Sequence, residues 1–298
     1  MIPDDNNPLL PDSFLEPPNS QMRAATTTSP LLVQPEPQPP IFQQYPEDLR
    51  VPWSWPDLLL LIAVTLLGTF VISIVLVGVF AAFGMTPTSL QNSSVNKSLF
   101  LIVNQAILSL GLLAYLAAQI HVRFQSPFWR TIGWRPLQTG AIPRRIVYLS
   151  LVLGGFSLSL LVQLASAALQ TKAKLPIQEY FQDPRSALLL MLMSILLAPL
   201  VEETIFRGYL YPVLARSFGV GAGVVITGTL FGLLHAPQLW GGWGQIALLI
   251  GVGIIFTAAR TISHTVVASY ILHLSYNSFL FIAFLIASHG LRHFPVGQ

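Results

Sequence analysis

Long apolar segments, separated by short polar loops, follow one another along the chain from residue 58 to residue 286. A helix needs roughly 20 apolar residues to cross a hydrocarbon layer of about 30 Å, which is the length scale of these segments. Apolar residues make up 53% of the chain and charged residues only 9%, whereas soluble domains carry about 25% charged residues. So few charges cannot cover the surface of a soluble protein. The chain is therefore expected to lie in a bilayer.

The apolar segments lack the alternation of a transmembrane β-strand, so they predict an all-α fold, a polytopic bundle of membrane helices. Pro199 lies inside the fourth segment, and a proline removes one backbone donor, so this segment is either one helix or two pieces. The sequence thus predicts seven to eight transmembrane helices. The segments are Leu58–Phe83, Leu99–Ile120, Ile146–Leu169, Ala187–Leu214, Gly219–His235, Gln245–Ala259 and Val266–Ile286.

Residues 1–56 differ in composition from the rest of the chain, since they hold 13 of its 23 prolines. Such a segment favours extended geometry and cannot bury a core, so it predicts a disordered cytoplasmic tail. A docking site for a Pro-recognising partner is the alternative. The remaining regions are three transmembrane helices with a basic loop (57–186), a membrane core with the candidate catalytic residues (187–287) and a short C-terminal tail (288–298).

The distribution of Lys and Arg predicts the orientation of the bundle. The loop over residues 121–145 is rich in arginine, whereas the loop over residues 82–98 has only Lys97. Cytoplasmic loops carry the excess of positive charge, so the 121–145 loop and, two spans earlier, the N-terminus are expected in the cytoplasm. Lys172, Lys174 and Arg185 weaken this bias without reversing it. The arginines of the basic loop are Arg123, Arg130, Arg135, Arg144 and Arg145.

Two adjacent acids stand inside an apolar segment. After Asp183 the chain has only two carboxylates, Glu202 and Glu203. Placing a charge near the bilayer centre costs at least about 2.5–3.5 kcal/mol, so each of the two side chains is expected to have a partner or a function. Glu203 has Arg207 four residues later, on the same helix face, which predicts a structural ion pair. Glu202 has no cation on its own face, which suits a general base or acid.

Two histidines and an asparagine lie in similar apolar runs. His235 ends the fifth segment, and His273 and Asn277 share one face of the seventh. For any one of them alone, a hydrogen bond between helices without any chemistry is the alternative interpretation. A turn near residues 216–219 would, however, make the fourth and fifth segments antiparallel and bring Glu202 and His235 to a similar depth, about 25 Å from the turn. Together these residues predict a reactive site.

The same residues carry a resemblance. Glu202-Glu203-Thr204-Ile205-Phe206-Arg207, Phe231-Gly232-Leu233-Leu234-His235 and His273-Leu274-Ser275-Tyr276-Asn277 resemble the EExxFR, FxxxH and HxxxN motifs of one membrane protease family. This is the CAAX protease and bacteriocin-processing (CPBP, or abortive infection) family, related to the type II CAAX prenyl endopeptidases. The resemblance covers residues 187–287.

The resemblance implies intramembrane hydrolysis of peptide bonds. Glu202 and His235 would activate water, His273 and Asn277 would stabilise the oxyanion, and Glu203 with Arg207 would be the supporting pair. Family members have been called metalloproteases, and Glu202, His235 and His273 could supply three Zn²⁺ ligands with one open position. The same side chains could instead work without any cofactor, as a glutamate protease.

The expected partners are the lipid bilayer and a membrane-associated protein or peptide, of the CAAX type or another type, and no nucleic acid. A multi-pass protein of a bacterial plasma membrane is the default, with a plastid membrane as the alternative. Two other functions remain open, a non-catalytic scaffold or immunity protein of the same fold and a proton-coupled transporter, in which intramembrane Glu and His also occur. The transporter is disfavoured because the ionisable groups are confined to three motifs.

Overall fold

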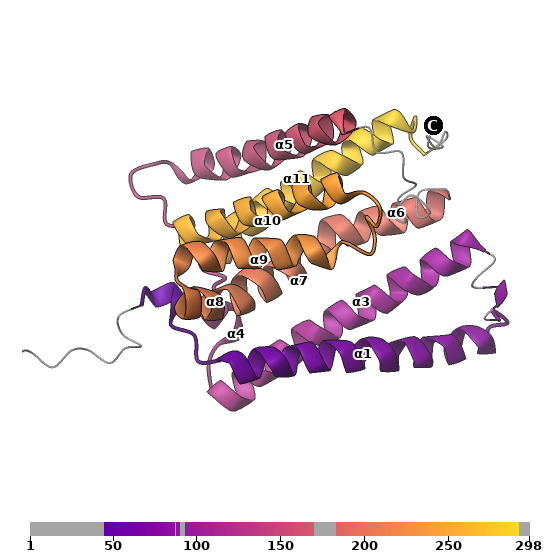
Figure 1. Cartoon of the computed structure of the whole chain (residues 1–298), viewed down its shortest axis with the longest axis horizontal. Helices are drawn as coiled ribbons and strands as arrows, with labels where there is room; N and C mark the ends of the chain where they lie inside the picture. Colours follow the sequence, from indigo (N-terminus) through magenta and orange to yellow (C-terminus); the bar gives the residue numbers. More distant parts are fainter. Residues whose placement is uncertain (1–44, 87, 90–92, 170–182, 292–298) are drawn as a thin grey trace, which may run out of the picture. The chain divides into compact units, whose positions relative to one another are not determined.

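The structure, a computed structural model, describes residues 45–86, 88–89, 93–169 and 183–291, all of which belong to one compact unit, residues 40–298. Every regular element with given bounds in these ranges is a helix (Figure 1). The α-helices are α1 (Trp55–Ala82), α3 (Ser94–Ala118), α4 (Phe128–Thr131), α5 (Arg144–Ala168), α6 (Pro184–Leu192), α7 (Ala198–Glu203), α8 (Tyr211–Phe218), α9 (Val220–Leu234), α10 (Trp243–Ser263) and α11 (Val266–Ala287). A 3₁₀-helix, η2 (Glu47–Leu49), and three π-helical stretches, η3 (Gln119–Arg123), η5 (Met193–Leu197) and η6 (Thr204–Leu210), complete the set.

The all-helical, polytopic bundle is confirmed, with a different count of spanning helices. Six helices of the described part are long and apolar enough to cross a membrane, and the chain is a multi-pass membrane protein. The fifth predicted segment instead forms α9, which has only 15 residues and is therefore about 22 Å long. The predicted bounds, Gly219–His235, agree with those of α9, and only the expectation that this segment is a full span differs.

The fourth segment is not divided into two pieces. Helices α6, η5, α7, η6 and α8 form one continuous helical run over Pro184–Phe218. Pro199 lies in the first turn of α7, directly after the π-helical η5. A proline is tolerated in a first turn because its missing N–H has no intrahelical partner there. The eighth transmembrane piece is therefore not formed.

Glycines bring α9 close to its neighbours α8 and α10. A Cβ atom on Gly223 would lie 2.8 Å from the backbone of Ala215, and one on Gly228 would lie 2.4 Å from the Ile254 nitrogen. Small residues allow such close approach of helices in lipid. Gly219 has a different task, since its φ of +86° makes the turn between α8 and α9. This antiparallel hairpin sets the depth of His235.

The disordered tail predicted for residues 1–56 is wrong for its last part, while residues 1–44 lie outside the described ranges. Leu49, Val51 and Trp53 are buried, and Trp53 stacks on Tyr209 at 4.7 Å and donates its indole N–H to the Tyr209 carbonyl at 2.8 Å. The prolines of this segment do not prevent packing, because its apolar side chains find partners on the helices. We call residues 45–53 the N-terminal strap.

A buried ion pair also holds the N-terminal strap. The carboxylate of Asp48 accepts from Arg260 Nη1 at 2.7 Å and lies 3.0 Å from His264 Nδ1. Burial opposes the charged form of Asp48, but Arg260 and His264 outweigh it, so the pKa of Asp48 lies below its ordinary value. This ion pair therefore joins η2 of the strap to the C-terminal end of α10.

Candidate active site

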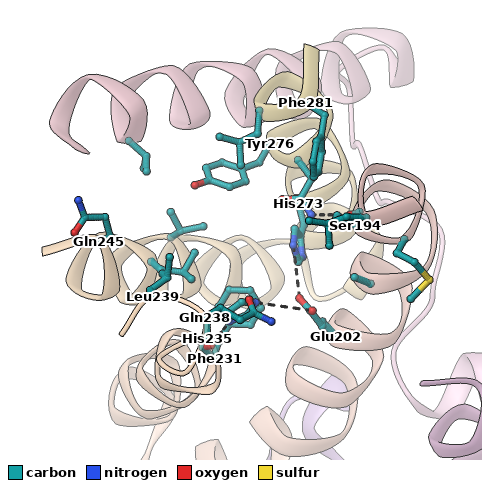
Figure 2. Close-up of a pocket in the computed structure, with 18 of the residues that line it drawn as sticks. Ser194, Glu202, Phe231, His235, Gln238, Leu239, Gln245, His273, Tyr276 and Phe281 are labelled. Carbon is teal, nitrogen blue, oxygen red and sulfur yellow. Dashed lines mark hydrogen bonds and ion pairs between the residues drawn. The ribbon is translucent and has the colours of Figure 1, made fainter. Parts of the chain in front are cut away.

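A cavity of ≈ 480 Å³ lies inside the bundle, between α3, α5, the run from α6 to α7, and α9 to α11. Most of its wall is apolar, but Glu202, His235, His273 and Asn277 all line it. Figure 2 shows Glu202, His235 and His273 pointing toward one another from three separate helical segments. The structure thus brings together the four residues that the sequence marked as catalytic candidates.

Glu202 lies near the end of α7, just before the π-helical η6, and 22% of its side chain is exposed. One carboxylate oxygen, Oε1, is 4.0 Å from His235 Nε2, and the other, Oε2, is 3.7 Å from His273 Nε2. Both distances exceed a direct hydrogen bond. A carboxylate with a histidine nitrogen beside each oxygen can exchange protons with a small molecule held between them.

His235 is the first residue after α9, so its ring extends from the end of that helix. Its Nδ1 lies 2.9 Å from the Phe231 carbonyl oxygen. Because a carbonyl only accepts, Nδ1 carries the proton, and in the neutral ring Nε2 has a free lone pair. That lone pair faces the cavity beside Glu202.

His273 lies two turns into α11 and is buried, with 4% of its side chain exposed. Its Nδ1 is 2.9 Å from Glu203 Oε1, so Nδ1–H donates a hydrogen bond to this buried carboxylate. The rings of Phe256 and Phe231 lie 4.9 and 5.6 Å from its ring. These contacts fix the ring with Nε2 toward the cavity.

Glu203 and Arg207 form the ion pair that their spacing predicts, at 2.9 Å and with no exposed side-chain surface. Arg207 also donates to the Gly253 carbonyl at 2.8 Å and to Thr257 Oγ1 at 3.2 Å, both on α10. Its guanidinium lies 4.4 Å from the centroid of the Phe231 ring. The pair therefore joins the helix of Glu202 to α9, α10 and, through His273, α11.

Asn277 lies one turn after His273 on α11 and donates from Nδ2 to the Ser194 carbonyl at 2.7 Å. A primary amide has two N–H donors, so a second one remains. Ser194 belongs to the π-helical η5. This contact positions the amide at the cavity wall.

Three contributors to the site were not identified from the sequence. Phe256 and Thr257 pack against His273 and Arg207, and the Ser194 carbonyl holds Asn277. Their residue types are ordinary in membrane helices, and a backbone carbonyl leaves no mark in a sequence. The sequence therefore carries no signal for these three contributors, whose positions at the site result from the packing of the helices.

The same residues were tested for a zinc site. Within the described residues, no group of three or more His, Cys, Asp and Glu side chains is arranged to hold a metal ion. Tetrahedral ligands at 2.0–2.1 Å from zinc are about 3.4 Å from each other, whereas Glu202 lies 4.0 and 3.7 Å from the two histidines. The side chains as placed do not fit zinc coordination.

Comparisons with known proteins give one match. Residues 184–279 match the family described as type II CAAX prenyl endopeptidase Rce1-like. No curated protein and no solved structure matches the chain. The matched range contains Glu202, His235, His273 and Asn277, and it includes most of the region that carries the three motifs. Residues 184–279 are thus similar to an Rce1-like, type II CAAX prenyl endopeptidase domain, which is consistent with an intramembrane protease of the CPBP family.

Proposed function

We propose that the protein is an intramembrane endopeptidase that hydrolyses peptide bonds of membrane-associated substrates. The observation that carries this proposal is the Glu202 carboxylate, which lies between the Nε2 atoms of His235 and His273 inside a cavity of the apolar bundle. The Rce1-like family of residues 184–279 favours a CAAX-type protease over a scaffold or a transporter.

The first step is the activation of water. The 4.0 Å between Glu202 Oε1 and His235 Nε2 leaves room for one water molecule that donates to both atoms. The lone pair of His235 orients this water, and Glu202 takes its proton as the water oxygen attacks the carbonyl carbon. A general base of this kind typically contributes about 10²–10⁴-fold to the rate.

The second step is the stabilisation of the oxyanion. A His273 ring that is protonated on both nitrogens donates from Nδ1 to Glu203 and from Nε2 into the cavity. The remaining N–H of Asn277 supplies a second donor. Donors fixed in advance by Glu203 and the Ser194 carbonyl need little reorganisation when the negative charge develops.

The last step restores the enzyme. The tetrahedral intermediate collapses, the C–N bond breaks, and the leaving nitrogen takes the proton that Glu202 received from water. One water is consumed, its OH remains on the acyl carbon, and one hydrogen is on the new amine. Glu202 is again a carboxylate.

We also propose that this chemistry needs no metal. Every proton transfer above is assigned to Glu202, His235 orients the water, and both oxyanion donors are held by neighbours. The alternative, in which Glu202, His235 and His273 bind Zn²⁺, requires that these side chains move closer together. Zinc, if bound, would supply a water of lowered pKa.

The test is the change Glu202→Gln, which retains the shape of the side chain and removes the base. Membranes of cells that make the parent or the variant are compared by sequencing protein N-termini. We expect new N-termini with the parent protein and their loss, by about 100-fold or more, with Glu202→Gln. Glu47→Gln is the matched control, because Glu47 is 70% exposed and lies in the N-terminal strap. Equal cleavage by Glu202→Gln and the parent would refute the proposed role.

A further inference from the structure

Tyr276 lies on α11 between His273 and Asn277, at a position that the HxxxN motif leaves free. Only 5% of the residue is exposed, and it lines the same cavity as the two motif residues. Figure 2 shows its hydroxyl projecting away from Glu202, on the side of the drawing where Gln245 lies. A polar group of α11 thus enters the cavity at a place that the proposed chemistry does not use.

The hydroxyl of Tyr276 has no hydrogen-bond partner within the described part of the chain. Two other buried tyrosines are paired, since Tyr209 donates to Gln119 at 2.7 Å and Tyr211 accepts from Thr261 at 2.8 Å. A buried hydroxyl without a partner costs free energy, and such groups are rare in native proteins. Packing does not account for it, because a phenylalanine ring would fill the same space. The hydroxyl therefore requires a partner that enters the cavity.

The ring that carries this hydroxyl is held in place by two helices. It packs against Phe256 and Val252 of α10 in one buried cluster, with 5.9 Å between the ring centroids of Tyr276 and Phe256. The backbone of α11 is fixed as well, because a Cβ atom on Gly155 of α5 would lie 3.1 Å from the Tyr276 nitrogen. A hydroxyl on so rigid a support can bind an acceptor with little loss of conformational freedom.

The cavity has the length and the lining of a peptide site. Its wall follows α10 from Gln245 to Phe256, which corresponds to about 16 Å of helix, and Phe256 lies against His273 at the reactive end. An extended peptide of about five residues has this length. Within the described residues no lysine or arginine lines the cavity, so an anion bound at Tyr276 would lack a counter-charge. A neutral carbonyl needs only a hydrogen-bond donor.

We infer that Tyr276 binds the substrate. Its hydroxyl donates one hydrogen bond to a main-chain carbonyl of the peptide, at a residue other than the one that the activated water attacks. This inference rests on the proposed peptidase function and adds to it a residue that aligns the peptide in the cavity. Because the bond is made both before and during the attack, it should lower KM and leave kcat nearly unchanged.

The first test is Tyr276→Phe, which removes the hydroxyl and keeps the ring. Tyr115→Phe is the matched control, because the Tyr115 hydroxyl is also buried without a partner among the described residues, but Tyr115 does not line the cavity. The substrate is a peptide that spans a cleavage site found by N-terminal sequencing. We expect Tyr276→Phe to raise KM by about 5-fold, the typical effect of one neutral hydrogen bond, with kcat changed by less than about twofold. Tyr115→Phe should change neither constant.

A change in the substrate identifies the acceptor. One main-chain carbonyl oxygen at a time is replaced by sulfur, which accepts hydrogen bonds weakly. At one position this replacement should raise KM for the parent protein and have no further effect with Tyr276→Phe, as a double-mutant cycle requires for two groups in contact. Equal effects on both proteins at every position would overturn the inference. So would an unchanged KM with Tyr276→Phe, which would mean that the hydroxyl binds only water.

Binding is also measured without catalysis, in the Glu202→Gln protein. The probe is pentaleucine with an acetyl group and an amide at its ends, a neutral peptide that matches the length and the apolar wall of the cavity. We expect Tyr276→Phe to weaken its binding by about 5-fold. Binding of hexadecane, which has no carbonyl, should be the same with and without the hydroxyl. No binding of the peptide, or an equal loss for both probes, overturns the inference.

The proposed function and this inference can fail separately. If the parent protein cleaves nothing while Tyr276→Phe weakens peptide binding, the peptidase function fails and the binding role of Tyr276 stands. If cleavage depends on Glu202 while KM and peptide binding do not depend on the Tyr276 hydroxyl, the peptidase function stands and the inference fails.

Discussion

At the scale of single residues, two adjacent glutamates have opposite environments. Glu203 is fully buried and bonded to Arg207 and His273, whereas Glu202 is partly exposed at the cavity. Spacing on one helix was enough to predict the Glu203–Arg207 pair, because i and i+4 side chains share a face. The contact of His273 with Glu203 joins two helices, and it depends on packing that no spacing in the sequence encodes.

We expect Glu203 and Arg207 to depend on each other for stability. Glu203→Gln or Arg207→Met leaves one charge buried without its partner, which typically costs about 3–5 kcal/mol. The double variant should lose less than the sum of the two single losses, and unfolding in detergent measures the coupling energy. Strictly additive losses would contradict the pairing.

We expect Asn277→Leu to lower kcat by about 10²-fold, because it removes one oxyanion donor while it keeps the branched shape of the side chain. KM should change little, since the donor acts on charge that develops in the transition state. Kinetics with a cleaved peptide, once identified by N-terminal sequencing, give both constants. A change in KM alone would assign Asn277 to substrate binding instead.

At the scale of elements, the glycines of α9 determine how closely it approaches α10. A Cβ atom on Gly228 would collide with the backbone of Ile254, whereas one on Gly251 would meet no atom within 4 Å. Gly228 and Gly232 stand four residues apart in the sequence, and small residues at this spacing indicate close helix packing, so this feature can be read from the sequence. The end of α9 at Leu234 also agrees with the predicted end of the fifth segment at His235, so only the assignment of this segment as a full transmembrane span differs.

We therefore expect Gly228→Ala to lower the melting temperature of the purified protein. Gly251→Ala is the matched control on α10, and it should leave stability unchanged or raise it, by up to about 1 kcal/mol, because alanine favours helices. Equal effects of the two changes would show that close packing at Gly228 does not limit stability.

The N-terminal strap has its own pH dependence. The lowered pKa of Asp48 means that the unfolded chain binds a proton at this site more readily than the folded chain does. Its contribution to stability is therefore fully present above the ordinary value of 3.8 and is lost as the pH falls through the lowered pKa. The difference in melting temperature between the parent and Asp48→Asn should shrink as the pH falls below about 4. A difference that does not change with pH would contradict the role of the Asp48 charge.

At the scale of the whole molecule, the sequence predicted the bundle, its membrane location and the residues that meet at the cavity. It did not predict the packing of residues 45–53. The high proline content of this region indicated disorder, and the sequence does not show that its few apolar side chains have partners on the helices. It also left the metal question open, because one glutamate and two histidines suit both mechanisms. Only the separation of their atoms, set by the packing of α7, α9 and α11, distinguishes the two arrangements.

The last prediction concerns metal removal from the full-length protein. A zinc enzyme loses its activated water when the ion is removed, whereas a glutamate protease retains its base and both oxyanion donors. We expect prolonged treatment with phenanthroline to leave most of the cleavage activity, and elemental analysis of the purified protein to find zinc well below one ion per chain. Glu202→Gln, treated in the same way, gives the background signal of the cleavage assay in the absence of catalysis. Stoichiometric zinc, with activity lost on its removal and regained on its return, would instead show that Glu202, His235 and His273 move together around a metal ion.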